Sequence, residues 1–195
     1  VVSALLASGP YYFLNRTSGA MVLSGQRREY LLYVPSSYNR SQPTPLVISM
    51  HGGGAWPAHQ RDTSGWNRLA ESQGFIVVYP AGSGAPGAWS VDHGTGLLDD
   101  VRFISELIDT LEAAYNIDPA RIYANGLSNG GGMAFVLSCT LSDRIAAVGM
   151  VAAAYSLPWS WCTDPRPVPM IAFHGTSDAL TPYHGGRSPV FPASF

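Results

Sequence analysis

The residues with the clearest chemical potential form a G-x-S-x-G pentapeptide centred on Ser128. A short apolar segment with β character, residues 121–125, precedes it, and an apolar segment of helical character, residues 133–139, follows it. Strand, sharp turn and helix in this order favour a nucleophile elbow, which lifts the serine hydroxyl clear of the chain at a helix N-terminus. The alternative is a glycine-rich turn that only caps a helix. We predict that Ser128 is a catalytic nucleophile.

A nucleophilic serine needs a base, usually a histidine, and a carboxylate that orients this base. Asp178 is the acid candidate because it lies in the loop that follows the last expected strand, residues 168–173. In sheets of this kind, active groups gather at the carboxyl ends of the strands. The alternative for Asp178 is a turn-forming, capping aspartate.

The developing negative charge on a substrate carbonyl needs backbone N–H donors. We expect one from Asn129, the residue after the serine, and the other from the glycine run after His51. Gly53 is the preferred donor in that run and Gly54 the near alternative. His51 is expected to pin the loop by a hydrogen bond.

The base is the missing group. His184, six positions on, is the only histidine after Asp178, and this spacing is too short for the helix and strand that should separate acid from base in this fold. His59, His93 and His174 lie in the wrong places in the order. We therefore expect the catalytic histidine beyond residue 195, in a segment absent from this chain or present as a separate one.

Several classes of function are disfavoured by composition. The chain has 195 residues, which fits one domain, and a net charge of −2 gives no reason to expect nucleic acid or an anionic membrane as partner. We expect no cofactor, since there is no metal-ligand spacing and no phosphate-binding loop.

Cys139 and Cys162 are equally consistent with two buried thiols or with a disulfide, and a disulfide would imply an oxidising compartment.

Strands and helices alternate along most of the chain, which predicts an α/β fold with a mostly parallel sheet and helices on both faces. Asp99 and Asp100 are expected to cap the helix that they open. Residues 1–19 read as an N-terminal extension or the remnant of a membrane anchor, and residues 20–195 as the domain, without its last helix and strand. The expected strands and hairpin arms are residues 20–24, 28–34, 46–50, 75–79, 121–125, 146–152 and 168–173, and the expected helices are 64–73, 99–115 and 133–139.

With these residues assembled, the chain resembles secreted α/β-hydrolase esterases of the polyhydroxybutyrate depolymerase and feruloyl esterase group, the carbohydrate esterase family one and its relatives. The resemblance covers roughly residues 22–192 and is carried by residues 30–35, 51–54, 99–101, 126–131, 142–147, 174–178 and 182–183.

This resemblance implies hydrolysis of carboxylic esters through an acyl-serine intermediate, with Ser128 as nucleophile, Asp178 as acid, and Gly53 and Asn129 as oxyanion donors. It also makes a Cys139–Cys162 disulfide and export from the cytoplasm more plausible. Members of the group carry further sequence after this point, which includes the catalytic histidine.

The sequence contains little information about which ester is the substrate. Feruloyl or acetyl esters of plant polysaccharide, short aryl esters and polyhydroxyalkanoates all fit, and Trp89 is our candidate substrate contact among loop tryptophans that also include Trp56, Trp159 and Trp161. Two other hypotheses are a serine peptidase of the same fold and a non-catalytic binding protein that has lost the histidine.

Overall fold

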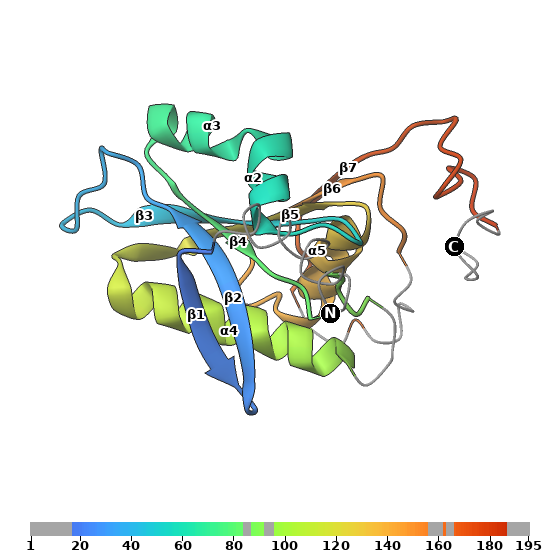
Figure 1. The fold of residues 1–195 in the computed structure, drawn as a ribbon. Coiled ribbons are helices and arrows are strands. Elements are labelled where there is room, and N and C mark those ends of the chain that lie inside the picture. Colours follow the sequence, from blue (N-terminus) through green and yellow to red (C-terminus); the bar gives the residue numbers. More distant parts are fainter. Residues whose placement is uncertain (1–16, 84–86, 92–95, 156–161, 163–165, 187–195) are drawn as a thin grey trace, which may run out of the picture.

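A single seven-stranded mixed sheet forms the centre of the molecule (Figure 1). The structure is a computed structural model that describes residues 17–83, 87–91, 96–155, 162 and 166–186. The strand order is β1-β2-β4-β3-β5-β6-β7. The first two pairings, β1 with β2 and β2 with β4, are antiparallel, and the other four are parallel. The predicted α/β fold with a mostly parallel sheet is confirmed.

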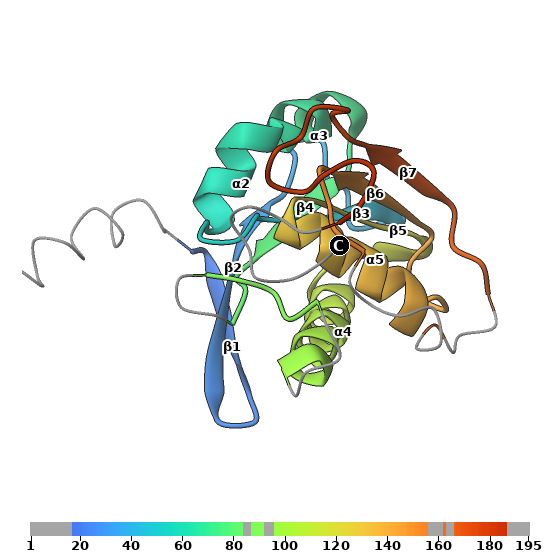
Figure 2. The ribbon, with the colours of Figure 1, turned by 90° about the vertical axis from the view of Figure 1, so that its right-hand side faces the viewer.

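The antiparallel edge is the predicted hairpin. Strands β1 (Gly19–Leu23) and β2 (Gln26–Tyr33) pair around a turn at Ser24 and Gly25, both of which have positive φ. The opposite edge is the four-residue strand β7 (Met170–Phe173). Figure 2 shows β1 and β7 on opposite sides of the molecule.

The central strands are β3 (Thr44–Met50), β4 (Ile76–Pro80), β5 (Ile117–Leu127) and β6 (Ala147–Val151). Strands β3 and β4 are almost entirely buried, as expected of a parallel sheet with both faces covered, whereas β5 and β6 have one face that is only partly covered. Side chains alternate between the two faces along each strand. Ile48, Val78 and Ile122 belong to the larger core cluster, whereas Val47 and Val77 belong to the smaller one on the opposite face.

Two pairs of helices cover the two faces unequally. Helices α4 (Gly96–Ala114) and α5 (Asn129–Thr140) lie below the sheet in Figure 1, and their buried side chains complete the larger core. Helices α2 (Pro57–Ser64) and α3 (Trp66–Gln73) lie above it. They pack against the half of the sheet that contains β2 and β4, where Ala70 and Trp66 meet Tyr79 and Val77.

The single helix predicted over residues 64–73 is wrong in its start. The chain forms two helices there, because Gly65 adopts the left-handed conformation, with φ of 67°, and ends α2 before α3 begins. Pro57 starts α2, where its missing N–H costs nothing. The polar face of α2 hid it from a search for apolar periodicity.

The capping role predicted for Asp99 and Asp100 separates into two different roles. Asp99 is exposed in the first turn of α4, where an acidic side chain favours the helix dipole. The prediction is wrong for Asp100, which is fully buried and forms an ion pair with Arg28, also buried, at 2.7 Å. Burial of one charge without the other would be strongly unfavourable, so this pair ties α4 to β2.

A disulfide joins Cys139, near the end of α5, to Cys162 in the connection between β6 and β7. The sequence left this pairing open beside two free thiols. The structure therefore supports an oxidising environment for the folded chain. In the described residues no helix is long and apolar enough to cross a membrane. Residues 1–16, most of the segment suggested as an extension or anchor remnant, lie outside the described residues.

We predict that replacing both cysteines with alanine lowers the free energy of unfolding by about 3 kcal/mol, because the disulfide closes a loop of 23 residues in the unfolded chain. Urea unfolding followed by tryptophan fluorescence measures this change. A reductant should destabilise the parent protein by a similar amount and leave the double variant unchanged. Equal stability of the parent with and without reductant would contradict the role of the disulfide.

Candidate active site

The predicted elbow forms at Ser128. This residue stands between β5 and α5 with φ of 52° and ψ of −119°. Residues other than glycine rarely adopt this backbone conformation. Two backbone hydrogen bonds hold it there: its N–H donates to the Val151 carbonyl at 2.7 Å, and its carbonyl accepts from Gly132 at 3.0 Å. Strain at a serine that is held from both sides is the feature expected of a nucleophile elbow.

Glycines are required on both sides of the elbow because the backbone passes very close to itself. A Cβ atom at Gly126 would collide with the backbone of Gly130. A Cβ atom at Gly130 would in turn collide with the carbonyl oxygens of Met50 and His51 at the end of β3. The start of α5 therefore lies directly against the loop that follows β3.

This close approach brings the two predicted oxyanion donors to one place. A Cβ built on Gly52 would lie 3.6 Å from the Ser128 Cβ, and one on Gly53 would lie 3.7 Å from the Asn129 Cβ. Gly54, the alternative donor, already gives its N–H to the Gly87 carbonyl at 2.7 Å. Among the described residues the Gly53 N–H has no such partner, so the geometry favours Gly53 over Gly54.

His51 is confirmed as the residue that pins this loop. The Gly82 N–H donates to its Nε2 at 3.0 Å, which leaves Nδ1 as the protonated nitrogen, 2.8 Å from the Gly52 carbonyl. Burial lowers the pKa of His51 and keeps the ring neutral. Both ring nitrogens are occupied in holding the backbone.

Trp89 has a buried setting that favours packing over the predicted contact with substrate. Its side chain is only 3% exposed, and its indole N–H donates to the His51 carbonyl at 3.1 Å. The backbone of Trp89 is bonded to the Asn129 side chain on both of its polar groups. Of the other loop tryptophans, Trp159 and Trp161 lie outside the described residues, and Trp56 packs against His59.

Asp178 lies in a tight turn after β7. Its Oδ1 accepts the N–H groups of Leu180 at 2.8 Å and Thr181 at 2.9 Å. These two donors, Thr181 first, hold the pKa of Asp178 below its ordinary value, so the carboxylate is ionised. The second oxygen, Oδ2, has only longer contacts, 3.4 Å to the Thr181 hydroxyl and 3.5 Å to His174 Nε2. It is therefore the atom of this carboxylate best placed to accept a further donor.

The structure brings none of the described histidines into contact with the serine. These histidines are His51, His59, His174 and His184. His174 supports the acid turn from inside, since its Nε2 lies 2.7 Å from the Thr181 carbonyl. His184 is exposed and packs edge-on against Tyr183. In the described part of the chain, none of the four forms a hydrogen bond with Ser128.

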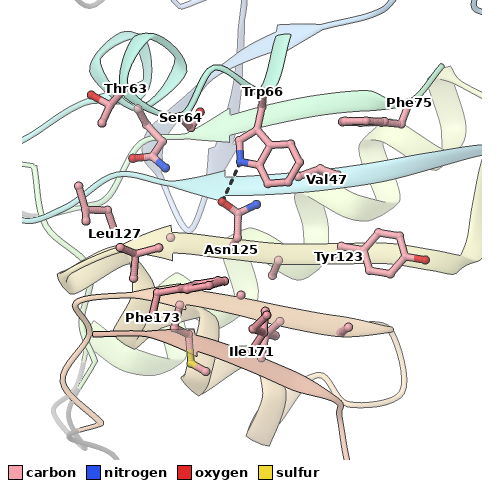
Figure 3. Close-up of a pocket in the computed structure, with 18 of the residues that line it drawn as sticks. Val47, Thr63, Ser64, Trp66, Phe75, Tyr123, Asn125, Leu127, Ile171 and Phe173 are labelled. Carbon is pink, nitrogen blue, oxygen red and sulfur yellow. Dashed lines mark hydrogen bonds between the residues drawn. The ribbon is translucent and has the colours of Figure 1, made fainter. Parts of the chain in front are cut away.

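A large apolar groove occupies the face of the sheet that α2 and α3 leave bare (Figure 3). Its volume is about 710 Å³ and its floor is the outward face of β5, β6 and β7. Ile171 and Phe173 are 56% and 58% exposed there, which is unusual for the face of a parallel sheet. Their neighbours in the floor are Tyr123, Asn125, Leu127, Ala147, Gly149 and Val151.

A polar cluster that the sequence did not reveal lies beside this groove and includes Asn125 from its floor. The Asn125 side-chain oxygen accepts hydrogen bonds from Ser49 at 2.9 Å and from the Trp66 indole at 3.1 Å, the bond drawn in Figure 3. Gln60 donates to the Ser49 hydroxyl at 3.0 Å. Its own oxygen, Oε1, is buried without a partner in the described residues. The four residues come from four elements, so no local pattern could have marked them.

Together these features define the class of protein. A mostly parallel sheet with helices on both faces, a strained serine between strand and helix, and a glycine loop against it make this an α/β-hydrolase fold. Residues 21–178 match the model of the Esterase family ("Putative esterase"), and the chain belongs to that family.

Its relatives include proteins named for two kinds of ester. The chain is 34% identical over 159 residues to a bifunctional acetylxylan esterase/xylanase of Neocallimastix patriciarum, covering 82% of this chain and 22% of that protein. It is 33% identical over 168 residues to feruloyl esterase B of Piromyces equi, covering 84% and 31%. For feruloyl esterase C of Emericella nidulans the identity is 29%, and the coverage is 87% and 61%. The chain thus spans less than two thirds of each of these relatives.

Solved structures agree on the fold. A thermostable esterase matches with a TM-score of 0.63 at 22% identity, covering 85% of this chain and 48% of its own. Esterase 2 of Thermogutta terrifontis, in its form phosphoramylated by tabun, matches with a TM-score of 0.66 at 16% identity, covering 87% and 76%. At these identities the likeness concerns the fold alone.

We predict that Gly130→Ala destabilises the protein by about 3 kcal/mol, because the added Cβ meets rigid backbone rather than a flexible side chain. Gly149→Ala in β6 is the matched control. A Cβ added at Gly149 would lie 3.5 Å from its nearest neighbour, the Asn125 Cβ, which is an ordinary van der Waals distance. The free energy of unfolding should therefore change by less than about 1 kcal/mol. Urea unfolding compares the two variants. Equal tolerance of both would mean that the elbow is not packed as described.

Proposed function

We propose that this protein is a serine carboxylic-ester hydrolase that works through an acyl-serine intermediate. The observation that carries the proposal is the strained backbone of Ser128 beside the loop that follows β3. In that loop Gly53 lies next to Asn129, the residue after the serine. Membership of the esterase family supports the reaction class.

The geometry is suited to a two-step reaction. The Ser128 hydroxyl oxygen attacks the ester carbonyl carbon while a base takes its proton. The carbonyl oxygen becomes an oxyanion facing the N–H groups of Gly53 and Asn129, and one such donor is worth on the order of 3 kcal/mol in the transition state. Collapse expels the alcohol, which takes the proton back from the base. A water molecule then repeats the sequence and releases the acid.

For the substrate we propose a feruloyl or acetyl ester of plant polysaccharide, because relatives named feruloyl esterase and acetylxylan esterase match more than four fifths of the chain. Short aryl esters share the same carbonyl chemistry. Polyhydroxyalkanoate has no named support among these relatives and rests on the motif resemblance alone. The disulfide between Cys139 and Cys162 favours export, since such bonds persist in oxidising compartments.

We propose that the base is a histidine outside residues 1–195, oriented by Asp178 through Oδ2. The described histidines are either committed to backbone contacts, as His51 and His174 are, or are unconnected to the serine. The exposed apolar face of β5–β7 supports a further segment of the same polypeptide, linked or separate, as its cover. A donor on that segment would also satisfy the buried Gln60 Oε1.

Ser128→Ala should reduce hydrolysis of p-nitrophenyl acetate and of methyl ferulate to the level without enzyme, because it removes the attacking oxygen. Ser138→Ala, a buried serine of α5 that bonds only to the Phe135 carbonyl, serves as control and should retain activity. Initial rates on both esters and on a peptide amide measure the effect. Unchanged turnover by Ser128→Ala would refute the proposal, and a preference of the parent for the amide would favour the peptidase hypothesis.

If the base lies outside this chain, residues 1–195 alone should hydrolyse p-nitrophenyl acetate about 10³-fold or more slowly than the protein at its natural length, since a triad without its base keeps only the oxyanion hole and binding. Single-turnover rates at equal concentrations of folded protein make the comparison. Full activity of residues 1–195, lost in His184→Gln, would overturn the proposal and identify His184 as the base. A natural-length protein without any activity would favour the non-catalytic binding hypothesis.

A further inference from the structure

Residues 87–90, here called the Trp89 segment, touch both halves of the candidate oxyanion hole. One half is Asn129 at the start of α5, and the other is the glycine loop after His51. These halves come from different strands, β5 and β3, and each supplies one N–H group. The relative position of the two donors therefore depends on whatever connects them.

The contact with the first half is a two-point clamp. The Asn129 Oδ1 accepts the Trp89 N–H at 2.6 Å, and the Asn129 Nδ2 donates to the Trp89 carbonyl at 3.0 Å. A side-chain amide paired on both sides with one residue's backbone has little freedom to rotate. Asn129, whose N–H is the first candidate donor, is therefore fixed through its side chain.

The contact with the second half is also made at two points. The Gly87 carbonyl accepts the Gly54 N–H at 2.7 Å, and the Trp89 indole N–H donates to the His51 carbonyl at 3.1 Å. These bonds lie on either side of Gly53 in the sequence. The Trp89 segment thus fixes the peptide units that flank the second donor.

A buried carboxylate holds the segment itself. The Asp100 Oδ2 accepts the Ser90 N–H at 2.9 Å, and its Oδ1 accepts from the Arg28 guanidinium at 2.7 Å. Arg28 also donates to the Ala81 carbonyl at 3.0 Å, and its guanidinium carbon lies 3.9 Å from the centre of the Phe103 ring. Asp100 is therefore anchored to β2 and α4 on one side and bonded to the Trp89 segment on the other.

We infer that the Trp89 segment sets the spacing of the two oxyanion donors, and that Asp100 is a positioning residue for ester hydrolysis through Ser90. This inference rests on the proposed function, because it takes Gly53 and Asn129 as the donors. Asp100 does not touch the substrate. It acts by holding a segment that is bonded at four points to the two halves of the site.

Such a role is visible in rates because catalysis depends steeply on donor position. A misplacement of about 1 Å costs up to about 100-fold in rate. Loss of the Ser90 contact leaves the elbow and the glycine loop in place, but it frees the segment that spans them. The ground-state ester binds largely outside the oxyanion hole, so its KM depends less on the segment than kcat does.

The test compares Asp100→Asn with Asp99→Asn in the protein at its natural length. The same chemical change is made one residue apart, and Asp99 is exposed and forms no hydrogen bond with residues 87–90. Diethyl p-nitrophenyl phosphate, taken to completion, counts the reactive serines in each sample, and kcat for p-nitrophenyl acetate is expressed per reactive serine. We expect Asp100→Asn to lower this kcat by about tenfold or more, with KM changed less than about twofold. Asp99→Asn should leave both unchanged.

Trp89→Phe keeps the inference testable if Asp100→Asn fails to fold. It removes the indole bond to the His51 carbonyl and part of the buried ring, and it keeps the two backbone bonds of Trp89 to Asn129. We expect kcat per reactive serine to fall by about threefold or more with an unchanged KM. A merely structural role would lower the number of reactive serines and leave kcat per serine at the parent value. That result in every variant that folds would overturn the inference. A parent protein that fails to react with the phosphate would instead contradict the proposed function of Ser128.

Discussion

The close passage of the α5 N-terminus against the end of β3 is the constraint on which the rest of the site depends. Gly130 allows this passage because any side chain there would meet the carbonyl oxygens of Met50 and His51. It forces Ser128 into a conformation that the Val151 carbonyl and the Gly132 amide then hold. It also brings the candidate donors Gly53 and Asn129, which come from distant parts of the sequence, close together. The proposed chemistry therefore depends first on a backbone contact and only then on side chains.

Two buried polar systems support this contact from opposite sides of the sheet. On the face covered by α4, the Arg28–Asp100 pair holds the loop that bears Trp89. On the other face, the side-chain oxygen of Asn125, one residue before the elbow begins, accepts hydrogen bonds from Ser49 and Trp66. Buried polar groups are costly unless they are bonded, so each system favours one arrangement of the strands over its alternatives. The elbow is thus braced by specific bonds above and below β5.

The sequence predicted the parts of the site that local patterns encode. The elbow, the hairpin and the buried strands each have a signature within a few residues, and all were found. Helix α2 was missed because its polar face and the break at Gly65 erase apolar periodicity. Asp100 was misread because its partner, Arg28, lies 72 residues away. Asn125 and Gln60 carried no signal at all, since their roles arise only when β3, β5, α2 and α3 pack together.

The candidate acid and the candidate nucleophile lie after strands of the sheet that have very different support. Ser128 follows β5, which has strands on both sides, whereas Asp178 follows β7, a four-residue edge strand whose side chains are all exposed in the described structure. Local opening of a protein begins where buried contacts are fewest. Amide hydrogens of β7 are therefore expected to exchange with solvent long before those of β5. The turn that carries Asp178 would be released in such excursions while Ser128 stays in place, so residues 1–195 lose the candidate acid before the candidate nucleophile.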